Sequence, residues 1–312
     1  MLLSGSRRTE QFVRRWRVFG ILAATLGLIC LSLLSTRLEA SPDLLAALNA
    51  KLAPPRVDQA KLSKAQPALL RAAVQQFNLA PRGKPQVYVI TIAAGGSQAL
   101  FGREAHAVQG IFASQLGTDS PSIVLSNAKL DLFKTPMASR ENLSAVLDAI
   151  GTRFDPERDM LLLYLTAHGA PQAFVQTDLP DAKQIEPLDA EFLAGALGKA
   201  KINRRILIIS ACFAGSWIPA LKSPDTIILT AASPYQPSFG CDDRRTYTWY
   251  GAALIDGGLG KGSTWHAAYD ELSATIARQE RENFLLASGP MADVGERMTA
   301  VWDAPLRPYA PR

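Results

Sequence analysis

Five short, almost wholly apolar runs alternate with longer stretches of helical hydrophobic spacing, and this alternation limits the folds open to the chain. The runs cover residues 87–92, 122–125, 160–165, 206–209 and 226–230. Such runs suit strands that are buried on both faces of a mostly parallel sheet. The longer stretches predict helices at 99–116, 140–153, 189–200, 248–255 and 264–282. We therefore predict an α/β fold, a three-layer sandwich with helices on both faces of the central sheet.

The excess positive charge of the chain is confined to its N-terminus. The formal net charge is +5, and the six arginines and one glutamate of residues 1–37 account for all of it. The remainder of the chain is neutral, so it offers no electrostatic footprint for a phosphate backbone. We expect no nucleic-acid partner.

An uncharged, mostly apolar run at 18–36 follows five of these arginines. About 20 apolar residues are enough to cross a bilayer, and the arginines that precede the run predict a cytoplasmic N-terminus with an exported body. We predict a basic cytoplasmic segment at 1–17 and a transmembrane signal anchor at 18–36. The body would face the periplasm as part of a single-pass inner-membrane protein. The alternative is a signal peptide that is cleaved to release the body into the periplasm.

The stretch between this run and the first predicted strand is rich in alanine, leucine and proline. Its prolines interrupt short helical patterns, so we predict a stalk or helical arm at 37–84. The folded domain is then expected at 85–312.

A histidine and a cysteine directly follow two predicted strands. The third strand leads into Thr166-Ala167-His168-Gly169, and the fourth leads into Ser210-Ala211-Cys212. Ligands of open parallel sheets bind at the carboxyl ends of the strands. A thiol with its ordinary pKa of about 8.5 is mostly protonated at neutral pH and needs a partner for its proton. We predict Cys212 as a nucleophile, His168 as its acid–base partner, and the backbone N–H groups of Gly169 and Cys212 as an oxyanion hole.

The strand-His-Gly motif and the Ala211-Cys212 motif with its following Gly215-Ser216 resemble those of the C13 family of cysteine peptidases, within the caspase clan. Further similar segments are found at 101–104, 230–234, 238–241, 248–251 and 287–290, the last three resembling the membrane-anchored bacterial branch. The resemblance implies a caspase-like fold and a cysteine endopeptidase that cleaves its peptide or protein substrate through a thioester. It also implies a substrate-binding role for Arg103, Ser210 and Ser233.

Two departures limit what this resemblance implies. Ser210 stands where legumain-like members carry an acidic residue, so cleavage after asparagine is not expected. No third catalytic residue is matched, and we therefore predict a Cys–His dyad.

Other readings of the same residues stay open. The dyad would also serve a transpeptidase or transamidase, if an amine replaced water. A catalytically silent caspase-like scaffold that binds peptides or a membrane partner is favoured if Cys212 is buried or bonded to Cys241. An α/β-hydrolase needs a G-x-C-x-G elbow, and Ser210 and Ala214 occupy those glycine positions. With three histidines, no C-x-x-C and no H-E-x-x-H, the sequence predicts no metal site and no cofactor.

Overall fold

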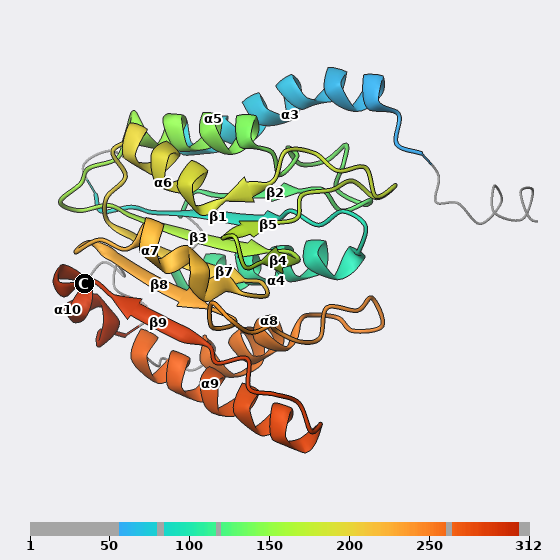
Figure 1. Ribbon diagram of the computed structural model, residues 1–312. Coiled ribbons are helices and arrows are strands. Elements are labelled where there is room, and N and C mark those ends of the chain that lie inside the picture. Colours follow the sequence, from blue (N-terminus) through green and yellow to red (C-terminus); the bar gives the residue numbers. More distant parts are fainter. Residues whose placement is uncertain (1–55, 80–83, 117–119, 260–263, 306–312) are drawn as a thin grey trace, which may run out of the picture. The chain divides into compact units, whose positions relative to one another are not determined.

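A six-stranded, mostly parallel sheet forms the middle layer of the fold in the computed structural model (Figure 1), which describes residues 56–79, 84–116, 120–259 and 264–305. The strand order is β2-β1-β3-β7-β8-β9. The strands are Val87–Ala93 (β1), Ser122–Ser126 (β2), Met160–Thr166 (β3), Arg205–Ser210 (β7), Thr226–Thr230 (β8) and Met291–Val294 (β9). All five predicted strands are present and parallel, so the predicted α/β class is confirmed.

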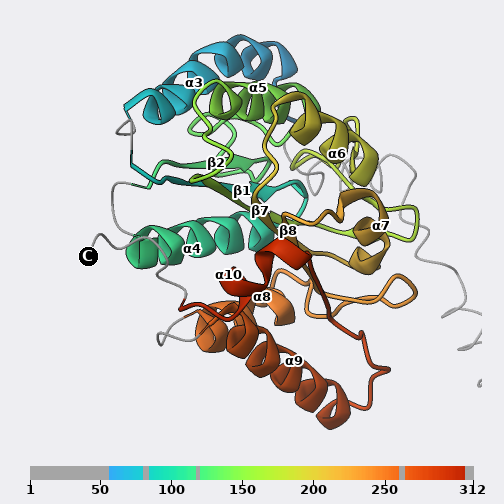
Figure 2. The same ribbon diagram turned by 90° about the vertical axis from the view of Figure 1, so that its left-hand side faces the viewer.

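Helices cover both faces of this sheet (Figures 1 and 2). One face carries Gln59–Leu79 (α3), Arg140–Gly151 (α5), Ala190–Lys199 (α6) and Ile218–Leu221 (α7). The other face carries Ala99–Leu116 (α4), Trp249–Ala253 (α8), Trp265–Glu282 (α9) and Thr299–Trp302 (α10). Short helical turns lie at Ala214–Trp217 (η1), Leu254–Gly258 (η2) and Glu296–Met298 (η3).

Along each central strand, the side chains point alternately into the two hydrophobic cores. Ile90, Leu163 and Leu207 form one row across β1, β3 and β7, and this row belongs to the core under α5 and α6. The preceding residues of the three strands form the next row, which belongs to the core under α4 and α9. Side chains of a strand alternate between its faces, so strands with two buried faces must be apolar at every position. This is why the runs lack polar alternation.

Helix α3 is packed into the domain and does not project from it as a stalk. Ala73 and Phe77 lie in the core that α3 shares with α5, and Phe77 is fully buried. The helix continues through Pro67, which the sequence analysis treats as an interruption. Helix α3 lies within 37–84, the predicted stalk or helical arm, and the boundary at residue 85 stays a prediction.

The predicted cytoplasmic segment and transmembrane anchor lie outside the described residues. Within the described part of the chain, no helix combines the length and the apolar character that a membrane crossing requires.

Two small elements of the fold are not predicted from the sequence. Strand β9 pairs antiparallel with β8 at the edge of the sheet. It is short and half-exposed, and Asp293 breaks the apolar pattern of its sequence. A second sheet, β4-β5-β6, consists of Gly169–Ala170 (β4), Phe174–Val175 (β5) and Leu188–Asp189 (β6). Two-residue strands leave no periodic pattern, although β4 directly follows His168.

A buried carboxyl group joins four elements beneath the carboxyl edge of the sheet. Glu104 of α4 is fully buried. It accepts hydrogen bonds from the Tyr164 hydroxyl at 2.5 Å, the Ser210 hydroxyl at 3.1 Å and the Thr248 backbone N–H at 2.7 Å. A Cβ at Gly251 would lie 2.2 Å from the Glu104 carboxyl. Glu104 therefore ties α4 to β3, β7 and the start of α8.

We predict that Glu104→Gln destabilises the domain. A carboxamide has one acceptor oxygen, and its NH₂ group would face a donor. The free energy of unfolding should fall by about 2–4 kcal/mol, because buried donors lose their partner. Urea unfolding followed by circular dichroism measures the change. Glu157→Gln, at an exposed loop position, is the matched control and should stay within about 0.5 kcal/mol of wild type. Equal losses in the two variants would contradict the role of Glu104.

Candidate active site

His168 and Cys212 occupy matching positions at the carboxyl edge of the sheet. Strands β3 and β7 are parallel neighbours in which Thr166 lies opposite Ser210, so each candidate residue comes two positions after a paired one. The segments that follow are in close contact, because a Cβ at Gly169 would lie 2.1 Å from the Cys212 carbonyl oxygen. Only glycine leaves room for this approach.

The Cys212 sulfur lies close to hydrogen-bond donors from the segment that follows β8. It accepts a hydrogen bond from the Ser238 backbone N–H at 3.3 Å and lies 3.7 Å from the Ser238 hydroxyl. When protonated, it can donate to the Ser238 carbonyl oxygen at 3.6 Å. The side chain is half-buried, and the cysteine is free.

These donors lower the pKa of Cys212 to about 5. The largest cause is a hydrogen bond from the Cys241 thiol, followed by the lesser effects of Ser238 and of the charge of His168, and burial opposes them. The pKa of Cys241 is raised, because its thiol is hydrogen-bonded to Cys212 and is itself half-buried. The Ser238 N–H that donates to the Cys212 sulfur favours Cys212 over Cys241 as the thiolate of this pair. These contacts favour the ionised form of the candidate nucleophile.

The pH dependence of alkylation tests this assignment. Iodoacetamide should modify Cys212 with a midpoint near pH 5, measured as the rate of carbamidomethylation of the Cys212 peptide by mass spectrometry. Cys241→Ala removes the main donor, so the midpoint should move to higher pH, and Cys241→Ser should move it less because a hydroxyl still donates.

Ser114→Ala is the control for this titration, since its hydroxyl bonds a backbone carbonyl on the surface of α4. The variant should titrate as wild type. A wild-type midpoint near the ordinary value of about 8.5 would contradict the assignment.

His168 is held from the side of β1 and α4. Its Nε2 lies 2.6 Å from Oε1 of Gln98, and its ring meets Phe101 edge-on, with centroids 5.2 Å apart and an angle of 87° between the rings. Gln98 also donates from its amide nitrogen to the Cys241 carbonyl oxygen at 2.9 Å. Sequence reasoning misses Gln98 in this place. Its position just past β1, at the same edge of the sheet as His168, is the signal that could have found it.

The backbone around both residues suits a site that binds an oxyanion. The Gln176 N–H donates to the His168 carbonyl at 2.8 Å, and Gly169 is the next residue in the β4–β5 pairing. Because hydrogen-bonded and non-hydrogen-bonded pairs alternate in an antiparallel ladder, the Gly169 N–H points away from β5. On the other side of Cys212, Phe213 has a left-handed backbone with φ of 57°. Such strain in a residue other than glycine is concentrated at functional sites.

The three predicted substrate-binding residues differ in their surroundings. Arg103 is partly exposed and donates to the Arg245 carbonyl at 2.8 Å and the Thr246 carbonyl at 3.4 Å. The Ser233 hydroxyl accepts from a backbone N–H within its own turn. Ser210 is 2% exposed and bonds to Glu104, so it supports Cys212 from the core. The substrate contacts of all three stay predictions.

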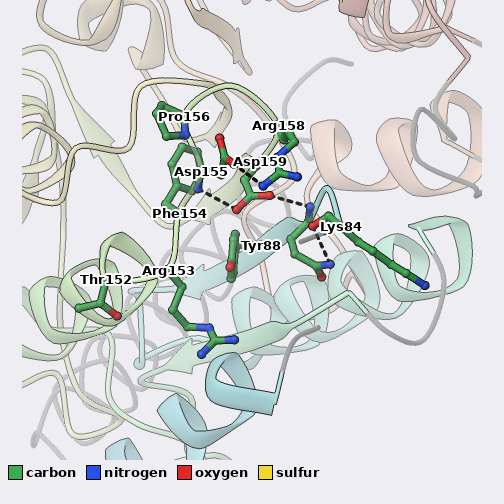
Figure 3. A pocket seen from close by; sticks show the side chains of 10 residues that line it. Lys84, Tyr88, Thr152, Arg153, Phe154, Asp155, Pro156, Arg158 and Asp159 are labelled. Atoms are coloured by element: carbon green, nitrogen blue, oxygen red, sulfur yellow. Dashed lines mark hydrogen bonds and ion pairs between the residues drawn. The ribbon is translucent and has the colours of Figure 1, made fainter. Parts of the chain in front are cut away.

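A cavity at the opposite edge of the sheet is separate from this site (Figure 3). It lies where β1 and β3 begin, and its charged side chains hold the local backbone. Asp159 accepts hydrogen bonds from the backbone N–H groups of Gln86 at 2.8 Å and Asp155 at 2.9 Å, and Asp155 pairs with Arg158 at 2.6 Å. These contacts hold the backbone in place, whereas the candidate catalytic residues His168 and Cys212 lie at the carboxyl edge of the sheet.

We predict that Gly169→Ala destabilises the protein, because the added methyl group would overlap the Cys212 carbonyl oxygen. The free energy of unfolding should fall by about 1–3 kcal/mol. Gly195→Ala is the matched control: it lies inside α6, where an added Cβ meets nothing within 4 Å, and it should raise stability by about 0.5–1 kcal/mol. Urea unfolding curves compare the two. Equal shifts would show that the segments after β3 and β7 are not in tight contact.

Comparison with known protein families finds a similarity over the segment that holds both candidate residues. The model of the Peptidase C13 family matches residues 144–298, a segment that contains His168, Gly169 and Cys212. This segment of the chain is therefore similar to the Peptidase C13 family, whose members are cysteine peptidases.

Two solved structures are similar to parts of the chain. One is Raptor from Chaetomium thermophilum, with 11% identity, a TM-score of 0.38 and coverage of 56% of this chain and 18% of Raptor. The other is a secreted C11 cysteine protease from Bacteroides thetaiotaomicron, solved with an irreversible peptide inhibitor. It has 11% identity, a TM-score of 0.39 and coverage of 62% of this chain and 60% of the protease. The chain thus spans less than two thirds of either protein, and no curated protein matches it.

Proposed function

We propose that this protein is a cysteine endopeptidase with a caspase-like fold, in which Cys212 and His168 form a catalytic dyad. The observation that carries the proposal is the surroundings of Cys212 inside a segment similar to the C13 family. Its pKa is lowered to about 5, and its carbonyl touches the segment that follows His168. A thiolate that is stable at neutral pH attacks without first losing a proton.

The reaction then follows from the positions of these groups. The Cys212 thiolate attacks the peptide carbonyl carbon, and a C–S bond forms while the carbonyl oxygen gains negative charge. The N–H groups of Gly169 and Cys212 stabilise that oxyanion. His168, in its imidazolium form, gives a proton to the leaving amine as the C–N bond breaks, leaving a thioester and a neutral imidazole. Water attacks the thioester, His168 takes its proton, and the thiolate leaves with the peptide acid released.

The state of Cys212 favours this proposal over a silent scaffold. A scaffold is expected if Cys212 is buried or bonded to Cys241, whereas both cysteines are free and half-buried. The same chemistry with an amine in place of water would make the protein a transpeptidase, and product analysis distinguishes the two.

We also propose that the domain acts at the inner membrane, facing the periplasm. The support is the uncharged run at 18–36, with the arginines that precede it. Protease treatment of spheroplasts tests this placement. Degradation of the domain without lysis supports it, and protection contradicts it.

The peptidase proposal predicts how two variants behave. Cys212→Ala should abolish both labelling by a peptidyl acyloxymethyl ketone and cleavage of denatured casein. His168→Ala should reduce turnover about 10²–10⁴-fold, the usual contribution of a general acid–base. Labelling is read by mass spectrometry and cleavage by released peptides.

His266→Ala is the matched control for these variants. His266 is half-exposed, pairs with Asp303 and lies at the start of α9, so this variant should act as wild type. Labelling that persists in Cys212→Ala, or full turnover in His168→Ala, would refute the proposed dyad.

A further inference from the structure

Gln98 stands at a position where a different kind of side chain is usual. It immediately precedes α4, and serine, threonine, aspartate and asparagine are preferred there because they cap the first backbone N–H groups. In this protein Asp243 supplies the cap, since its carboxylate accepts from the Leu100 N–H at 3.1 Å. The Gln98 side chain therefore does not cap the helix, and its carboxamide oxygen contacts His168 instead.

The orientation of the Gln98 carboxamide is set by its two partners. Its NH₂ group donates to the Cys241 carbonyl oxygen at 2.9 Å, and a carbonyl can only accept. Its oxygen then faces Nε2 of His168 at 2.6 Å. A carboxamide oxygen also only accepts, so Nε2 must carry the proton in this contact.

We propose that Gln98 is the positioning residue of the catalytic site, which fixes the tautomer and the ring orientation of His168. This inference rests on the proposed peptidase function. Because Nε2 keeps its proton in the bond to Gln98, Nδ1 is the nitrogen that exchanges a proton with the leaving amine and with water. Phe101, one helical turn further along α4, holds the ring plane by its edge-on contact. The residues at the start of α4, Gln98 just before it and Phe101 in its first turn, thus supply both constraints on the imidazole.

The same side chain links the base to the environment of the nucleophile. Gln98 holds the Cys241 backbone, and the Cys241 thiol is the main donor to the Cys212 sulfur. Loss of the Gln98 carboxamide should therefore disturb the proton transfer at His168 more than the binding of substrate.

Histidine NMR on the full-length chain in detergent micelles tests the inference without relying on activity. Long-range ¹H–¹⁵N correlation distinguishes the two neutral tautomers of His168, which is assigned with His168→Ala. The wild type should show the Nε2–H form. Gln98→Met keeps the length of the side chain but loses both bonds, so the population of the Nε2–H form should fall and the Nδ1–H form should appear beside it. Its casein turnover should fall roughly ten- to hundredfold in kcat, with little change in KM.

Two further variants complete the design. Gln98→Glu retains an acceptor and should keep the Nε2–H form and most of the turnover. Gln109→Met is the matched control: Gln109 is a glutamine of the same helix whose amide bonds the Ser122 hydroxyl at 3.1 Å, and it should change neither tautomer nor kcat.

The outcomes separate this inference from the proposed function. An Nδ1–H wild type, or an Nε2–H form unchanged in a folded Gln98→Met, overturns the role of Gln98 even if Cys212 is catalytic. The expected tautomers together with Cys212-independent cleavage would instead overturn the peptidase proposal.

Discussion

The candidate site depends on the register between β3 and β7. Thr166 lies opposite Ser210, and the same register carries Leu163 and Leu207 into one core and their neighbours into the other. A slip by one residue would turn every buried side chain of a strand to the opposite face. The packing of two hydrophobic cores therefore holds His168 and Cys212 at equal heights on the sheet. The precision of the site comes from apolar strands that take no part in the chemistry.

Two different tasks are divided among the groups around Cys212. The donors that lower its pKa come mainly from Cys241 and Ser238, both in the segment that follows β8. His168 adds only a minor electrostatic effect. The thiolate form of Cys212 is thus stabilised largely by fixed hydrogen bonds. In the proposed mechanism the imidazole then exchanges protons with the leaving group and the water. This division explains why the thiolate and the base are held by separate segments of the chain.

Much of the fold and part of the site follow from the sequence, for a physical reason. Strands buried on both faces must be apolar throughout, so the five parallel strands are visible as runs, and the residues that follow them are candidates for chemistry. The sequence predicts His168 and Cys212 in this way, and their catalytic roles stay a prediction. It does not predict the contact of Gln98 with His168 or the hydrogen bond between the Cys241 and Cys212 thiols, because side-chain contacts between distant segments leave no local pattern. For a similar reason the sequence does not predict the short strands β4 and β9 or the packing of α3, since each depends on partners that are remote in sequence.

The segment from Ser238 to Thr248 shows why such contacts matter. Its residues supply a donor to Cys212, the carbonyl that orients Gln98, the cap of α4 and an N–H donor to Glu104. Arg103 holds the same segment through two backbone carbonyls. One irregular stretch thus contacts both Cys212, the proposed nucleophile, and Gln98, which bonds the proposed base His168. A loop can do this only because α4 and the buried Glu104 anchor it on rigid elements. Its displacement would disturb the surroundings of both members of the proposed dyad at once, so the proposed reactivity depends on the order of this segment.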